Sequence, residues 1–244
     1  MDRNDREVIV LPTNMAISRA AELFMEAMES LTGEVAVCLT GGEEARLLYE
    51  EMANQHIQKI PWRRTRWFWS DERFVPPESE HSNVAMAKRI LLEPGGASPD
   101  SISAIPTIER GSPAEAAAQY ALEIASRRVQ RHEARLPLFD IVLHGIGADG
   151  HTASLYPGRP HDVDERRRLA LGVEMSEMPP LLPRVSLTLS ALNDSNLGLM
   201  LALGEDKREA VARALAEDKI PAALTDSRGR MIWILDEAAG GGIS

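Results

Sequence analysis

Hydrophobic and polar residues follow two alternating patterns along the chain, one typical of buried strands and one typical of amphipathic helices. Short apolar runs predict strands at 8–11, 34–40, 65–70, 140–143, 185–189, 197–203 and 231–235. A spacing of 3.6 residues between apolar positions predicts helices at 14–31, after Gly42 to about Gln55, and at 205–216. A further helix, from Pro113 to about Arg131, is expected because residues 112–115 form a capping box with proline at the first helical position.

Strands that alternate with helices favour parallel pairing. We therefore expect an α/β fold, a Rossmann-like and mostly parallel sheet with helices on both faces and room for a small subsidiary lobe. The 244 residues suffice for one such domain, and no repeat or long linker divides 1–244. The glycine-rich end, 237–244, is expected to be a mobile tail.

Composition excludes several other classes of protein. Hydrophobic residues make up 44% of the chain and charged residues 26%, as in ordinary globular proteins. The 37 acidic and 27 basic residues give a formal charge of −10, which argues against nucleic-acid and membrane-surface partners. No apolar run approaches the roughly 18 residues of a membrane helix, and the charged start lacks a secretory signal pattern. With Cys38 as the single cysteine, these features favour a cytoplasmic protein and leave the oligomeric state open.

Three predicted strands end in segments that could bind a ligand. They are TGG at 40–42, SDER at 70–73 and HGIG at 144–147. In parallel sheets, ligands bind beyond the carboxyl ends of the strands. Each segment alone also fits the usual richness of α/β loops in glycine and polar residues, but together they are a first indication of a site.

His151 is the strongest catalytic candidate, in the glycine-rich segment GIGADGHT at 145–152. The segment contains the spacing G-x-G-x-x-G, but Pro157 and Pro160 interrupt the helix that a dinucleotide-binding turn requires. Histidine titrates near neutrality and suits general acid–base catalysis. From position alone, a hydrogen-bonded loop histidine fits as well. His144, inside an apolar run, is expected in the core.

Three positive side chains could hold an anion. Lys207 falls in the first turn of the helix 205–216, where a cation opposes the helix dipole by about 0.3–1 kcal/mol. An anion bound there would reverse that cost, although Glu205 and Asp206 could offset the charge as well. Arg184 precedes a strand, and its planar fork suits phosphate. Arg73 follows an aromatic strand, where a charged triplet is also common on solvated surfaces.

Taken together, four segments resemble the 6-phosphogluconolactonase family, in the right order and over most of the chain. They are LTGG at 39–42, WFWSDERFVPPESEHSN at 67–83, DIVLHGIGADGHTASLYPG at 140–158, and PRVSLTLSALN with LALGEDK at 183–207. The third is the most specific, because DGHTASLYPG follows the family pattern almost without substitution. The related aminosugar-phosphate isomerase/deaminase family shares the DGH element, but it continues differently and favours tyrosine at the position of Arg73.

The resemblance implies an enzyme that hydrolyses 6-phosphogluconolactone (6-phospho-D-glucono-1,5-lactone) to 6-phosphogluconate in the oxidative pentose phosphate pathway. Its partner would be a small phosphorylated sugar lactone. His151 would be the general base that takes a proton from the attacking water and could return it to the ring oxygen. Gly41 and Gly42 would contribute backbone positions to the substrate site, and Asp71 would lie near the substrate.

The resemblance also places Arg73, Arg184 and Lys207 around the anionic substrate. Arg73 is expected to stabilise the charge that develops on the carbonyl oxygen, and Arg184 with Lys207 to hold the phosphate. Asp149 is expected either to set the turn or to orient His151. No metal or organic cofactor is implied, because attack on a strained ester needs only a base and charge stabilisation.

The chain departs from the family pattern directly after the double glycine. The family usually has serine, then threonine or another small residue, then proline, where this chain has Glu43, Glu44 and Ala45. Two carboxylates favour the start of a helix but repel a phosphate. The departure is compatible with weak binding, a shifted phosphate, a different tolerance for acidic groups, or loss of activity.

Three functional hypotheses therefore stand after the sequence alone. The first is a lactonase, and the second is a glucosamine-6-phosphate isomerase/deaminase. The third is a non-catalytic sugar-phosphate-binding relative. The first leads, because the His151 segment and all three cations are present.

Overall fold

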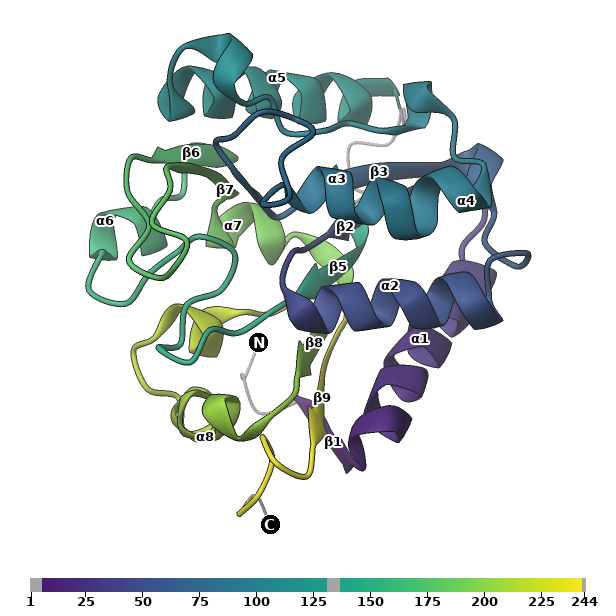
Figure 1. Ribbon diagram of the computed structural model, residues 1–244, viewed down its shortest axis with the longest axis vertical. Coiled ribbons are helices and arrows are strands. Elements are labelled where there is room, and N and C mark those ends of the chain that lie inside the picture. The colour runs from purple at the N-terminus through teal and green to yellow at the C-terminus, as the bar shows by residue number, and fades with distance from the viewer. Residues whose placement is uncertain (1–5, 131–136, 243–244) are drawn as a thin grey trace.

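The computed structural model describes residues 6–130 and 137–242, and a six-stranded sheet runs through these residues (Figure 1). The strand order is β1-β9-β8-β5-β2-β3, and every neighbouring pair is parallel. The strands are β1 (Glu7–Leu11), β2 (Val35–Leu39), β3 (Thr65–Trp69), β5 (Phe139–His144), β8 (Ser195–Ala202) and β9 (Arg230–Asp236). All six lie at or within a few residues of the predicted runs, so the expected parallel sheet is confirmed.

Helices cover both faces of this sheet, as predicted. Alternate side chains of a strand point to opposite faces, and along β9 they enter two separate cores. Ile232 belongs to the core beneath α1 (Thr13–Ser30) and α2 (Glu43–Gln55), whereas Trp233 belongs to the core beneath α8 (Arg208–Leu215). A 3₁₀ turn that contains Lys207 precedes α8, so the predicted helix 205–216 begins as a tighter turn.

A small antiparallel sheet, in the order β4-β7-β6, stands apart from the main sheet. Its strands are β4 (Asp71–Arg73), β7 (Arg184–Leu187) and β6 (Ala170–Val173). The expectation of parallel pairing was wrong for the predicted strand 185–189, which forms β7 here and passes into a helix at Leu189. β4 and β6 were not predicted, because β4 consists of three charged residues and β6 is four residues long with a glycine among them.

The remaining helices surround the small sheet and its connections. α5 (Pro113–Gln130) packs on β6 and β7, and the backbone N–H of Glu115 donates to Ser112 Oγ as the predicted cap requires. The predicted end of this helix, Arg131, lies outside the described residues. The short helices are α3 (Asn83–Ala87), α4 (Glu93–Gly95), α6 (Pro160–Val163) and α7 (Leu189–Leu192). Among the described helices, none combines the length and the apolar character needed to cross a bilayer.

The segment predicted to be a mobile tail is placed as far as Gly242, and residues 243–244 lie outside the described part. Ala239 is buried, and its N–H donates to Asp236 Oδ1 at 2.8 Å. Arg208 Nε donates to the carbonyl of Ala238 at 2.9 Å. These contacts hold the chain after β9 against the body of the protein.

His144, the last residue of β5, is buried in the core as expected, and it makes stability depend on pH. Burial lowers the pKa of His144 to about 4, so the folded chain keeps this imidazole neutral. The unfolded chain takes up the proton near pH 6.5, so the free energy of unfolding should fall as pH drops from 6.5 to 4, by on the order of 3 kcal/mol.

The variant His144→Leu should lose this part of the pH dependence. Urea unfolding of both proteins at pH 7 and pH 4.5 measures it. Equal losses of stability in wild type and variant would show that folded His144 takes up a proton freely.

Candidate active site

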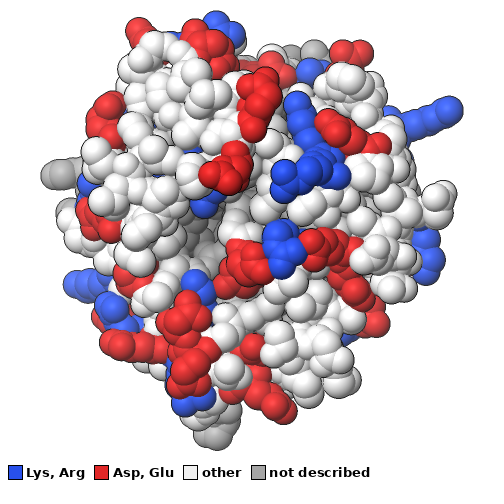
Figure 2. Space-filling model, in the orientation of Figure 1, with Lys and Arg blue, Asp and Glu red and all other residues white. Residues whose placement is uncertain are grey.

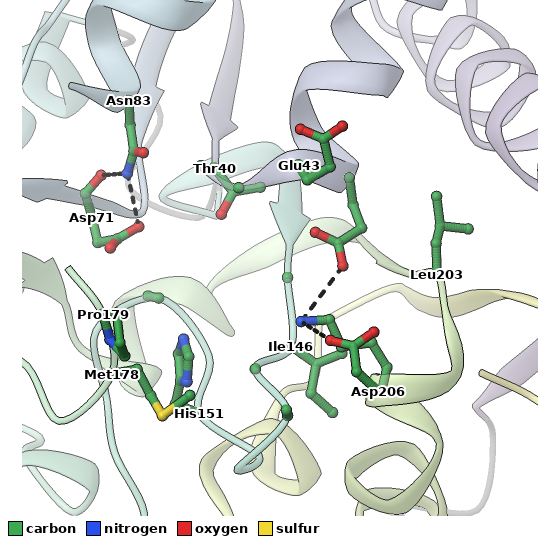
Figure 3. A pocket seen from close by; sticks show the side chains of 18 of the residues that line it. Thr40, Glu43, Asp71, Asn83, Ile146, His151, Met178, Pro179, Leu203 and Asp206 are labelled. Atoms are coloured by element: carbon green, nitrogen blue, oxygen red, sulfur yellow. Dashed lines mark hydrogen bonds and ion pairs between the residues drawn. The ribbon is translucent and has the colours of Figure 1, made fainter. Parts of the chain in front are cut away.

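The carboxyl ends of four neighbouring strands, β8, β5, β2 and β3, border a cavity of about 520 Å³. Figure 2 shows the surface hollowed near its centre, with acidic and basic side chains around the opening, and Figure 3 shows the interior. Seven of the eight sequence-predicted site residues line this cavity: Gly41, Gly42, Asp71, Arg73, His151, Arg184 and Lys207. The eighth, Asp149, lies directly behind His151.

The loop after β5 holds the His151 imidazole in one orientation. The N–H of Gly147 donates to the carbonyl of His151 at 2.9 Å, which closes the loop. The ring Nδ1 lies 2.6 Å from Asp149 Oδ1, and the ring packs against Tyr156 with 5.0 Å between centroids. The side chain is about one-fifth exposed, at 21%. A carboxylate on Nδ1 leaves Nε2 as the nitrogen available to a ligand in the cavity.

Asp149 is placed to fix the tautomer of His151. Its half-burial opposes ionisation, but the hydrogen bond and charge of His151 outweigh that effect and lower the pKa of Asp149. An ionised carboxylate accepts hydrogen bonds only, so it favours the imidazole with the proton on Nδ1. The contact with Nδ1 fits orientation of His151, and the N–H of His151, which donates to the same Oδ1 at 3.1 Å, fits a role in setting the turn.

Arg73 and Arg184 face each other across the small sheet, as cross-strand partners of β4 and β7. Arg184 is only 4% exposed, and its Nη2 donates to the carbonyl of Pro180 at 3.2 Å. Arg73 Nη1 donates to the carbonyl of His81 at 2.7 Å. The Nε atoms of both arginines are buried and have no partner among the described residues. Like charges directly opposite each other destabilise a sheet, so negative charge on a ligand near either guanidinium would stabilise this pair.

Asp71 is a buried junction between these elements. Its Oδ2 accepts from Ser154 Oγ at 2.7 Å and lies 3.9 Å from Arg184 Nη1. Its Oδ1 accepts from Ser70 Oγ at 3.2 Å and, more weakly, from Asn83 Nδ2 at 3.5 Å. Asp71 lines the cavity as expected, but these contacts make it a support for the site walls.

Ser154 ties the loop that carries His151 to β4, and its loss should be costly. The variant Ser154→Ala leaves a buried carboxylate oxygen of Asp71 without its shortest hydrogen bond, which should lower the free energy of unfolding by about 1–3 kcal/mol. Denaturant unfolding measures the change. Ser126→Ala removes an exposed hydroxyl on α5 and serves as the control, with an expected change within about 0.5 kcal/mol. Equal effects of the two substitutions would contradict the structural role of Ser154.

Lys207 is not free in the cavity. Its Nζ lies 3.4 Å from Asp206 Oδ2 and 3.7 Å from Glu44 Oε1, and both contacts are among the dashed lines of Figure 3, where Asp206 is labelled. The offset by Asp206 was considered from the sequence, whereas the contact with Glu44 was not. Within the described residues, no group of three or more His, Cys, Asp or Glu side chains could hold a metal ion.

Comparison with known proteins places this geometry in a family. The model of the family described as glucosamine-6-phosphate isomerases/6-phosphogluconolactonase matches residues 12–233. The chain belongs to this family. It is 38% identical to a 6-phosphogluconolactonase from Streptomyces coelicolor, over 92% of this chain and 89% of that one. It is 30% identical to a 6-phosphogluconolactonase from Nostoc, over 98% and 99%. The structure of a 6-phosphogluconolactonase from Trypanosoma cruzi superposes with a TM-score of 0.84 at 25% identity, over 98% and 97%.

Glu43 and Glu44, the two residues that depart from the lactonase family pattern after the double glycine, differ in exposure and in their partners. Glu43 is 67% exposed and pairs with Arg46, whose Nε donates to Glu43 Oε2 at 2.8 Å. Glu44 is 18% exposed and points to Lys207. Burial raises the pKa of Glu44, while its own backbone N–H and Lys207 act in the opposite direction. Both residues line the cavity, but only Glu44 contacts one of its cations, Lys207.

Sequence reasoning missed several residues that shape this family site. Asn83 lines the cavity, and its amide lies so close to Gly41 that a Cβ on Gly41 would come within 2.0 Å of Asn83 Oδ1. Met178 and Pro179 form the wall beside His151 (Figure 3). Asn83 stood at the end of a recognised motif, which could have marked it, whereas the segment with Met178 carries no pattern that points to a site.

Proposed function

We propose that this chain hydrolyses 6-phosphogluconolactone to 6-phosphogluconate, with His151 as the general base. One observation carries the proposal: an imidazole held by Asp149 opens onto the same cavity as Arg73, Arg184 and Lys207. Hydrolysis of a phosphorylated lactone needs a base near the ester carbon and positive charge near the phosphate, both within the length of one substrate molecule. The curated relatives named 6-phosphogluconolactonase, at 30–38% identity over nearly the whole chain, support the same reaction.

The reaction begins when Nε2 of His151 takes a proton from a water molecule. The water oxygen forms a bond to the lactone carbonyl carbon, and the carbonyl oxygen becomes an oxyanion. When the oxyanion collapses, the bond between this carbon and the ring oxygen breaks, and His151 returns the proton to the ring oxygen. Asp149 keeps the Nδ1 proton in place throughout and stabilises the imidazolium that forms between the two transfers.

Positive charge has two tasks in this reaction, one at the oxyanion and one at the phosphate. Arg73 is proposed for the oxyanion, because a fixed N–H donor aimed at developing charge lowers the barrier. Arg184 is proposed for the phosphate, because its guanidinium is buried and anchored and still offers an N–H donor. The predicted cytoplasmic location and the independence from cofactors stay predictions.

A paired assay tests the proposal. The wild-type protein should speed the disappearance of 6-phosphogluconolactone well above its spontaneous rate and release no ammonia from glucosamine 6-phosphate. Ammonia release without lactone hydrolysis would assign the chain to the isomerase/deaminase branch. Binding of 6-phosphogluconate with neither activity would make it a non-catalytic relative.

A further inference from the structure

The start of α2 and Lys207 together form one end of the cavity, and this end already holds a carboxylate. Glu44 lies in the first turn of α2, where backbone N–H groups and the helix dipole favour an anion. Its side chain points to Lys207 and not to solvent, with 3.7 Å between Oε1 and Nζ. Burial raises the pKa of Glu44, and its backbone N–H and the charge of Lys207 favour the ionised form against that effect.

The ammonium of Lys207 therefore has carboxylate partners within the protein before a substrate binds. Asp206 lies 3.4 Å from the same ammonium, so two carboxylates contact one cation. Glu43, the other acidic residue here, is turned away (Figure 3) and is balanced by Arg46. A phosphate approaching Lys207 would have to displace Glu44 or be repelled by it.

The part of the cavity wall formed by Arg73 and Arg184 has more positive than negative charge. Arg184 is nearly fully buried and has Arg73 directly across the strand pair, so two guanidinium groups share one edge. The nearest carboxylate to Arg184, Asp71, lies 3.9 Å away and already accepts from Ser154. Each arginine keeps one buried Nε–H without a partner among the described residues.

We propose that Glu44 is a specificity-determining residue whose carboxylate takes the anion position beside Lys207, so that the substrate phosphate is held by Arg184 and gains little from Lys207. The proposal changes the expectation from sequence that Arg184 and Lys207 hold the phosphate together. It rests on the proposed function only in taking a phosphorylated sugar acid as the ligand.

Calorimetric titration with 6-phosphogluconate and with gluconate tests the proposal, because the two ligands differ only in the phosphate. The ratio of their dissociation constants reports the contribution of the phosphate. The proteins compared are wild type, Glu44→Ser, Glu44→Gln, Lys207→Met and the double variant Glu44→Ser/Lys207→Met. Glu51→Gln is the matched control, since it also removes one acidic charge from α2. Glu51 lies outside the cavity, where it accepts a hydrogen bond from Ser18.

Lys207→Met alone should change the affinity for 6-phosphogluconate by less than about threefold, because its charge is already paired. Glu44→Ser should tighten 6-phosphogluconate binding by about tenfold or more and gluconate binding by less than about twofold. Glu44→Gln keeps the size of the side chain and should tighten phosphate binding in the same direction. The double variant should lose the gain, because the new affinity depends on the freed ammonium. Glu51→Gln should resemble wild type.

Four results would overturn the proposal. A loss of about tenfold or more from Lys207→Met in the wild-type background would show that Lys207 already binds the phosphate. Unchanged or weaker binding in both Glu44 variants, or a gain that persists in the double variant, would remove Glu44 from specificity. Wild-type protein that binds 6-phosphogluconate no more tightly than gluconate would exclude Arg184 as the phosphate ligand. Failure of lactone hydrolysis alone would refute the proposed function and leave these binding results standing.

Discussion

The variant His151→Ala should hydrolyse 6-phosphogluconolactone with a kcat lower by about 10²–10⁴-fold, the usual contribution of a general base. The loss should fall on kcat and not on substrate binding, because the cations that hold the substrate stay in place. Initial rates of lactone disappearance, corrected for spontaneous hydrolysis, measure it. Titration with 6-phosphogluconate should give a dissociation constant close to that of wild type.

A matched control is available in His81. Its side chain is exposed, and it serves the site only through its backbone carbonyl, which accepts from Arg73. The variant His81→Ala keeps that carbonyl and should retain wild-type turnover. If His151→Ala turns over within a few-fold of wild type, another group activates the water and the mechanism proposed here is wrong.

The second large effect is expected from Gly147, which touches the imidazole without taking part in chemistry. A Cβ on Gly147 would come within 2.0 Å of His151 Nδ1 and 2.6 Å of Asp149 Oδ1. The variant Gly147→Ala must therefore displace the ring, the carboxylate of Asp149 or both. A displacement of about 1 Å at a reacting group can cost on the order of 10²-fold in rate, so kcat should fall about that far while the fold survives.

Gly145 offers the comparison, because it belongs to the same loop and a Cβ there would meet nothing within 4 Å. Gly145→Ala should cost far less in kcat than Gly147→Ala. The two variants should also differ in the NMR resonances of the His151 ring, which move only if the contact with Asp149 changes. Equal kinetic losses, or unchanged ring resonances in Gly147→Ala, would show that this contact does not position the base.

Much of the fold could be predicted because its elements carry local patterns. The buried strands of the main sheet are continuous apolar runs, and α1 shows the helical spacing over its whole length. The small sheet could not be predicted in the same way. β4 consists of three charged residues, Asp71 to Arg73, and becomes a strand only because β7 pairs with it from more than a hundred residues away.

In the candidate site, too, the features with a local sequence pattern could be predicted and the contacts between distant segments could not. The residues grouped from loop motifs meet in one cavity because parallel strands bring their carboxyl ends to one edge of the sheet. The contacts between loops could not be predicted from the sequence, since no local pattern indicates that Ser154 contacts Asp71 or that Glu44 contacts Lys207. The sequence did identify position 44 as unusual, and the structure supplies its partner.

The net negative charge of the chain makes the local distribution of charge in the cavity important for binding an anionic substrate. With a formal charge of −10, the protein as a whole does not attract an anionic substrate. Attraction must come from the strand-borne arginines, whose partners are mainly backbone carbonyls and not carboxylates. Lys207 shows the contrast, because the two carboxylates beside it offset its charge.

The crystal structure of the His151→Ala variant soaked with 6-phosphogluconate tests the central claim most directly, because the ligand carries both the reacting carbon and the phosphate. We predict that its carboxylate lies where His151 Nε2 reaches in wild type, within about 3.5 Å of that position, and that its phosphate contacts Arg184. A ligand bound outside the cavity, or one bound with its phosphate at the position of the imidazole, would contradict the account.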